Sequence, residues 1–142
     1  MLYLPIVFDI INIKEGIKVK GKLYLNYMAN VGHSKGLKVA ICRNLLNGDE
    51  KRVDILKRGL APTDASRLKY QSGEIDWEQF RSDYLIKLYS RPGLNALMWL
   101  LDELKKGDVT VLCYCKPSNN CHRYILGEVM RDEGIEVIDI VK

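Results

Sequence analysis

Proline is sparse in this chain of 142 residues, with 4 Pro, and the 11 Gly are no more than an ordinary share. Collagen-like, disordered and coiled-coil chains have far more biased compositions, so these classes are excluded. The rest of the composition, with 47% hydrophobic and 28% charged residues, is typical of a globular protein with a buried core. The length matches about one domain, so residues 1–142 are expected to form a single domain.

No hydrophobic run approaches the roughly 20 residues that a membrane-spanning helix needs. The apolar stretch at residues 2–13 is interrupted by Asp9 and has no basic region before it, which argues against a signal peptide. We therefore expect no membrane contact and a cytoplasmic location. Thiols stay reduced in that compartment, so the 4 Cys indicate metal binding, catalysis or burial rather than a disulfide framework.

Glycine-rich phosphate loops are also absent: there is no Walker loop and no G-x-G-x-x-G after a predicted strand, so no cofactor is expected. The net charge of +4 is uneven, because residues 1–70 are net positive and residues 71–142 are net negative. This pattern fits an anionic small molecule or nucleic acid as a partner. Nucleic acid is weakly supported, since Lys18, Lys20 and Lys22 alternate with other residues as on a solvated strand face. The oligomeric state is left open.

Hydrophobic periodicity predicts an α/β fold. Alternation and β-favouring residues predict strands at 3–13, 22–28, 37–43, 109–115 and 135–141. Helical spacing and capping residues predict helices over 65–70, from 76 to 91, from 92 to 107, and over 121–133. The last strand, helix and strand form a crossover unit, which makes its two strands parallel. We predict a mostly parallel, Rossmann-like sheet with helices on its faces, in three layers.

Sulfur and polar residues follow the predicted strand at 109–115. Strand alternation places Cys113 and Cys115 on one face, with Cys115 at the end of the strand. Asn119 or Asn120 is expected to cap the helix that follows. In open parallel sheets, ligands bind beyond the carboxyl ends of the strands and beside helix N-termini. The sequence therefore predicts a ligand pocket here.

Three reactive side chains, those of Cys121, His122 and Arg123, are expected in the first turn of that helix. A thiol beside an imidazole, a guanidinium and a helix N-terminus has a lowered pKa and can act as a nucleophile. Cys115 or Cys121 is predicted to be that nucleophile. His122 is predicted to move the proton.

Two arginines are predicted to bind an anion in this pocket. Arg123 offers a bidentate guanidinium beside the backbone N–H groups at Asn120. Arg43 ends the predicted strand at 37–43, so it is expected to reach the same edge of the sheet. An ordinary surface ion pair is the alternative for Arg43.

The cysteines also have structural interpretations. Cys113 and Cys121 fit small core residues, because each lies on the predicted buried side of its element. A zinc site made of Cys113, Cys115, Cys121 and His122 has suitable ligand types. It lacks a C-x-x-C pair, however, and convergence of the adjacent Cys121 and His122 is geometrically awkward. We therefore favour a site without a metal.

Several stretches resemble the archaeal-type branch of an uncharacterised family, domain of unknown function 488 (DUF488). They are VAICR at 39–43, LAPT at 60–63, YQSGEIDWEQF at 70–80 and LCYCKPSNNCHR at 112–123. The resemblance covers residues 23–141. It implies a compact α/β fold and a pocket lined by the side chains singled out above. It implies no particular reaction.

The leading hypothesis is thus a pocket that recognises an anion, in a protein that acts on a nucleotide-like or other phosphorylated small molecule. Two alternatives remain open. One is a non-catalytic module that binds nucleic acid or a protein through the basic first half of the chain. The other is a thiol redox or zinc-stabilised structural role.

Overall fold

The computed structural model describes residues 19–115 and 120–140, so the strand predicted at 3–13 lies outside the described residues. Five strands form one all-parallel sheet in the order β3-β2-β4-β1-β5. They are β1 (Leu23–Tyr27), β2 (Leu37–Ala40), β3 (Ile55–Leu56), β4 (Val109–Cys113) and β5 (Val137–Asp139). The prediction of an α/β fold with a parallel sheet is confirmed.

The central strand β4 lies between β2 and β1. All of its residues are buried, as the run VTVLC, apolar except for the β-favouring Thr110, predicts for a strand covered on both faces. Leu112 is opposite Ala40 of β2, and Cys113 is opposite Tyr27 of β1. The carboxyl ends of these three strands therefore meet at one edge of the sheet.

In the described residues, four α-helices follow the predicted segments. They are α2 (Asp64–Gln71), α3 (Trp77–Leu88), α4 (Arg91–Lys106) and α5 (His122–Asp132). Thr63 caps α2 by accepting a hydrogen bond from the Ser66 N–H, and Asp76 caps α3 by accepting one from the Gln79 N–H. No helix in the described part of the chain has the length and apolarity needed to cross a bilayer.

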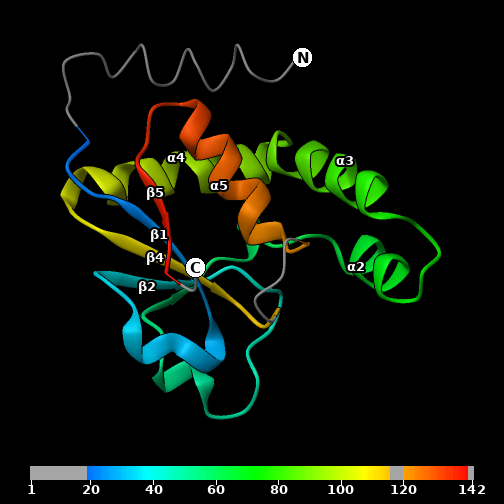
Figure 1. Cartoon of the computed structure of the whole chain (residues 1–142), viewed down its shortest axis with the longest axis horizontal. Helices are drawn as coiled ribbons and strands as arrows, with labels where there is room; N and C mark the ends of the chain where they lie inside the picture. The colour runs from blue at the N-terminus through cyan, green and yellow to red at the C-terminus, as the bar shows by residue number, and fades with distance from the viewer. Residues whose placement is uncertain (1–18, 116–119, 141–142) are drawn as a thin grey trace.

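The two faces of the sheet are covered unequally. Figure 1 shows α4 and α5 on one side of the sheet and short turns on the other. The short turns include η1 (Met28–His33) and η2 (Asp49–Lys51), both 3₁₀ helices. The links β1–β2 and β2–β3 form only these 3₁₀ turns and loops in the described chain, and so this outer layer is thin. A smaller apolar cluster that includes Met28 and Leu112 fills it.

One detail of the sequence prediction is wrong. Asn120 does not cap α5: the N-cap is Cys121, in an extended conformation and without a side-chain capping bond. Asn119, the other predicted cap, lies outside the described residues. The helix starts one residue later than predicted, and the Cys121 sulfur lies 3.1 Å from the Cys113 sulfur.

Candidate functional site

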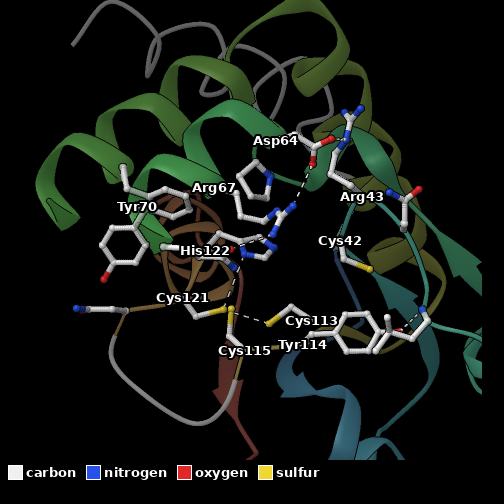
Figure 2. A pocket seen from close by; sticks show the side chains of 16 residues that line it. Cys42, Arg43, Asp64, Arg67, Tyr70, Cys113, Tyr114, Cys115, Cys121 and His122 are labelled. Atoms are coloured by element: carbon white, nitrogen blue, oxygen red, sulfur yellow. Dashed lines mark hydrogen bonds and ion pairs between the residues drawn. The ribbon is translucent and has the colours of Figure 1, made fainter. Parts of the chain in front are cut away.

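A cavity of about 480 Å³ opens where β2 and β4 end. It is the pocket shown in Figure 2 and is called the edge pocket below. Its walls come from the segment after β2, the helix α2 after β3, and both sides of the β4–α5 connection. This position, beyond the carboxyl edge of a parallel sheet, is where the sequence predicts a ligand pocket.

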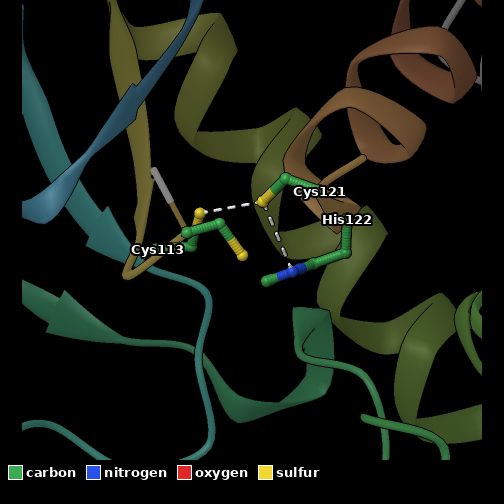
Figure 3. A group of neighbouring side chains, drawn as sticks. Cys113, Cys121 and His122 are labelled. Atoms are coloured by element: carbon green, nitrogen blue, oxygen red, sulfur yellow. Dashed lines mark hydrogen bonds between the residues drawn. The ribbon is translucent and has the colours of Figure 1, made fainter. Parts of the chain in front are cut away.

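The floor of the edge pocket contains three thiols and one imidazole. The side chains are those of Cys113, Cys115, Cys121 and His122, called the sulfur–imidazole cluster below. One ligand atom from each lies within 4.8 Å of all the others. Figure 3 shows the Cys121 sulfur between the Cys113 sulfur, at 3.1 Å, and Nδ1 of His122, at 3.9 Å. All four cysteines of the described chain are free thiols.

The convergence corrects one argument made from the sequence. Adjacent Cys121 and His122 do converge, because Cys121 is the extended N-cap and His122 is the first helical residue. The change of backbone conformation between them turns both side chains toward the end of β4. The cluster therefore has the ligand types and the proximity of a metal site, as well as those of a thiol-based active site.

The Arg123 side chain lies beneath the cluster and is fully buried. One of its terminal nitrogens donates to the Cys113 sulfur at 3.0 Å, to the Cys115 carbonyl oxygen at 3.0 Å and to the Cys121 sulfur at 3.3 Å. The other terminal nitrogen donates to the Tyr124 hydroxyl. Arg123 is not among the residues that line the edge pocket. Its predicted contact with a bound anion stays a prediction, and its observed partners include the sulfurs of Cys113 and Cys121.

The three thiols have different proton affinities. Hydrogen bonds from Cys115 and Cys121, together with the charge of Arg123, lower the pKa of Cys113 well below its usual range. The hydrogen bond to Cys113 raises the pKa of Cys115 to about 11. Burial raises the pKa of Cys121 as well. The surroundings therefore favour a negative charge on Cys113 over one on Cys115 or Cys121.

His122 is neutral and held in one orientation. Burial lowers the pKa of its imidazole. Nε2 lies 2.7 Å from the Ile41 carbonyl oxygen, which can only accept, so Nε2 carries the proton. Nδ1 therefore presents its lone pair to the sulfurs. The Tyr84 ring packs edge-on against the imidazole, with ring centroids 5.4 Å apart.

Positive charge lies at the mouth of the edge pocket. Arg43 follows β2, and Arg67 is carried by α2. Asp64 pairs with both guanidinium groups, at 3.8 Å and 3.6 Å. All three side chains are about half-exposed, so the ion pairs are weak and can exchange for a ligand. The prediction that Arg43 and the Cys-His segment share one site is consistent with this placement (Figure 2).

Aromatic side chains form much of the remaining wall. Tyr70 and Phe80 stack with their ring centroids 5.0 Å apart. On the opposite side, the Tyr114 hydroxyl donates to Asp49 at 2.5 Å and accepts from the Leu46 N–H at 2.8 Å. A ligand in the pocket thus meets apolar surface between the cationic mouth and the sulfur floor.

Several site residues were not singled out as site residues from the sequence. They are Cys42, Asp64, Arg67, Tyr70, Phe80 and Tyr114, while Cys113 was favoured as a core residue and otherwise considered only as a zinc ligand. One signal was available for the residues of α2. This helix follows β3 after a short connection, so its first turn belongs to the same sheet edge as the ends of β2 and β4. No local pattern in the sequence predicts which aromatic side chains contact one another in the pocket wall.

Most of this pocket falls inside a stretch that matches a protein-family model. The model is DUF488-N3a, described as the active DUF488-N3 subclade, and it matches residues 25–134. The chain belongs to the DUF488-N3a family. The matched stretch includes the last three residues of β1, all of β2 to β4 and α5, and every member of the sulfur–imidazole cluster. Assignment to an archaeal-type branch stays a prediction. Searches of curated proteins and of solved structures find no match to this DUF488-N3a chain.

Proposed function

We propose that this chain is an enzyme that binds a small anionic molecule in the edge pocket and attacks it with a thiolate from the pocket floor. The observation that carries the proposal is the arrangement of one cavity, with Arg43 and Arg67 at its mouth and the sulfur–imidazole cluster at its base. Two cations attract and orient an anionic group, while a buried thiolate supplies a nucleophile.

A phosphorylated, nucleotide-like molecule is the substrate class that best fits these walls. The anionic group would displace Asp64 from Arg43 and Arg67, and the flat faces of Tyr70 and Phe80 would contact the apolar part. The volume of about 480 Å³ suits a molecule of this size. A cytoplasmic, reducing location belongs to the same proposal, since the chemistry requires free thiols.

Cys113 is the proposed nucleophile, in place of Cys115 or Cys121. Its sulfur accepts hydrogen bonds from Arg123 and faces the other two thiols. When it bonds to an electrophilic centre of the substrate, the bond from that centre to the leaving group breaks. A thiol proton from Cys115 can then pass to the leaving group, because Cys115 is protonated at neutral pH and lies nearer the opening.

Binding is tested with the full chain by calorimetric titration of inorganic phosphate, pyrophosphate and nucleoside monophosphates. We expect at least one of these ligands to bind, and Arg43→Gln and Arg67→Gln each to weaken it about tenfold, the equivalent of one charge-assisted hydrogen bond. Arg131→Gln is the matched control, because Arg131 is an exposed arginine that is absent from the pocket walls. Absence of binding, or equal binding by all variants, would overturn the anion site.

The nucleophile is tested by iodoacetamide labelling across pH, read by peptide mass spectrometry. We expect Cys113 to be labelled well below the pH range of an ordinary thiol, near 9.0. Cys42, whose pKa is raised by burial, is the internal control in the same pocket. Labelling of Cys113 only at the pH where Cys42 reacts would contradict the assignment.

A further inference from the structure

We propose that the sulfur–imidazole cluster is also a binding site for a thiophilic divalent cation, best matched by Zn²⁺. The ligands are the Sγ atoms of the three cluster cysteines and Nδ1 of His122. This goes beyond the proposed function, because the cation occupies the floor of the edge pocket whether or not an anion is bound at the mouth. Metal-bound and metal-free forms are then two chemical states of one site.

The spacing of the four ligand atoms suits a tetrahedral ion. Zinc binds sulfur at about 2.3 Å and imidazole nitrogen at about 2.0–2.1 Å, so ligand atoms around it lie roughly 3.8 Å or less from one another. In the chain, all four atoms lie within 4.8 Å of one another, and the Cys113 and Cys121 sulfurs are 3.1 Å apart. Adjustments of less than about 1 Å at each ligand would therefore complete the site.

The orientation of His122 is that of a metal ligand. Histidines that bind metals almost always donate their second ring N–H to a backbone carbonyl, a carboxylate or a water. Here Nε2 donates to the Ile41 carbonyl oxygen at 2.7 Å, so the lone pair of Nδ1 faces the Cys121 sulfur. The backbone of the segment after β2 thus fixes the tautomer before any ion arrives.

Arg123 completes the charge balance of the site. Three thiolates and a neutral imidazole around a divalent cation leave one net negative charge in a buried place. The fully buried Arg123 guanidinium supplies one positive charge and donates to the sulfurs of Cys113 and Cys121. A buried ion cluster is stable only when its charges are paired and hydrogen-bonded, and Arg123 provides both at two of the three sulfurs.

The ligand set also selects the class of metal. Thiolate sulfur binds Zn²⁺ and related soft ions, whereas Mg²⁺ and Ca²⁺ require oxygen ligands. A sulfur that bonds to zinc shares with the metal the lone pair that it would otherwise use to attack a substrate. Zinc should therefore suppress thiolate chemistry at Cys113 while leaving the arginines at the mouth available to an anion.

The test uses the full chain, purified under reducing conditions, stripped with a chelator and titrated with ZnCl₂ against a chromophoric chelator. Binding of one Zn²⁺ per chain is expected, and CoCl₂ should produce the intense visible absorption of tetrahedral cobalt thiolate. His122→Gln and Cys115→Ser should each weaken zinc binding at least tenfold. Cys115→Ser is the milder change, since Cys115 is only half-buried.

Cys42→Ser is the matched control, because Cys42 lies in the same pocket but outside the cluster. Failure to bind zinc at micromolar concentration, or an equal loss in Cys42→Ser and Cys115→Ser, would overturn the metal site. Zinc should also protect Cys113 from iodoacetamide. If zinc does not bind while the phosphate titrations still depend on Arg43, the metal inference alone falls. If zinc binds and no anion does, the proposed function falls instead.

Discussion

The guanidinium of Arg123 donates a hydrogen bond to the Cys113 sulfur at 3.0 Å, although both side chains are almost completely removed from solvent. A buried arginine cannot lose its proton, so it requires an anionic partner. Burial alone would lower the pKa of Arg123, but the nearby charges of Cys113 and Cys121 raise it overall. The buried guanidinium therefore stabilises negative charge on the Cys113 sulfur, and the sulfur in turn stabilises the buried arginine.

Replacing Arg123 should make Cys113 a weaker acid. In Arg123→Gln, the charge-assisted hydrogen bond is lost, so the pH at which half of Cys113 reacts with iodoacetamide should rise by about one to two units. Arg131→Gln, on the exposed side of the same helix, should leave that midpoint unchanged. An unchanged midpoint in Arg123→Gln would show that the arginine does not stabilise the thiolate.

Removing Asp64 should strengthen anion binding. Asp64 shares its one negative charge between Arg43 and Arg67 in the free pocket, and a ligand must displace it. Asp64→Asn should therefore lower the dissociation constant of the phosphate ligand by about three- to tenfold at low ionic strength, with less effect at high salt. Glu136→Gln, which frees Lys22 at the opposite edge of the sheet, should have no effect. Weaker binding by Asp64→Asn would argue that the carboxylate itself contacts the ligand.

Tyr114→Phe should lower stability in a manner that depends on pH. The change removes the hydrogen bonds of the Tyr114 hydroxyl to Asp49 and Leu46, which should reduce the free energy of unfolding by about 1 kcal/mol near neutral pH. Burial, with the hydrogen bond to Asp49, raises the pKa of Tyr114 from 10.0 to about 12.

Because that pKa is higher in the folded state, its stabilising contribution is complete below pH 10 and is lost as the pH rises from 10 to 12. The difference between the original chain and Tyr114→Phe should therefore be constant up to pH 10 and then shrink. Urea unfolding at a series of pH values measures this difference. A difference that grows above pH 10 would have the wrong sign.

Gly93→Ala should disrupt the junction between α3 and α4. A Cβ atom at Gly93 would lie 2.2 Å from the Lys87 carbonyl oxygen and 2.3 Å from that of Leu88. Since backbone atoms must move, we expect a loss of about 3 kcal/mol in the free energy of unfolding. Gly32→Ala is the control, because no atom lies within 4 Å of the corresponding Cβ. Equal thermal midpoints for the two variants would contradict this reading of the junction.

Local patterns in the sequence predict the elements well. The run from Val109 to Cys113 is buried on both faces, and Thr63 and Asp76 cap their helices. These features depend on residues close together in the chain, through side-chain alternation, capping bonds and helical spacing. Even so, the sequence placed the helix N-cap one residue too early, at Asn120. It therefore did not predict the backbone conformation that turns Cys121 and His122 toward each other.

The sequence by itself determined the parallel α/β fold, the sheet edge at which a ligand would bind, and the presence of sulfur, imidazole and guanidinium there. Only the tertiary structure decided which groups touch. It buried Arg123 beneath the thiols, made Cys113 the most acidic of them, and brought Arg67 to the mouth beside Arg43. Proton affinity and ion pairing depend on burial and on distances of a few ångströms between residues far apart in the chain, and no local pattern encodes those distances.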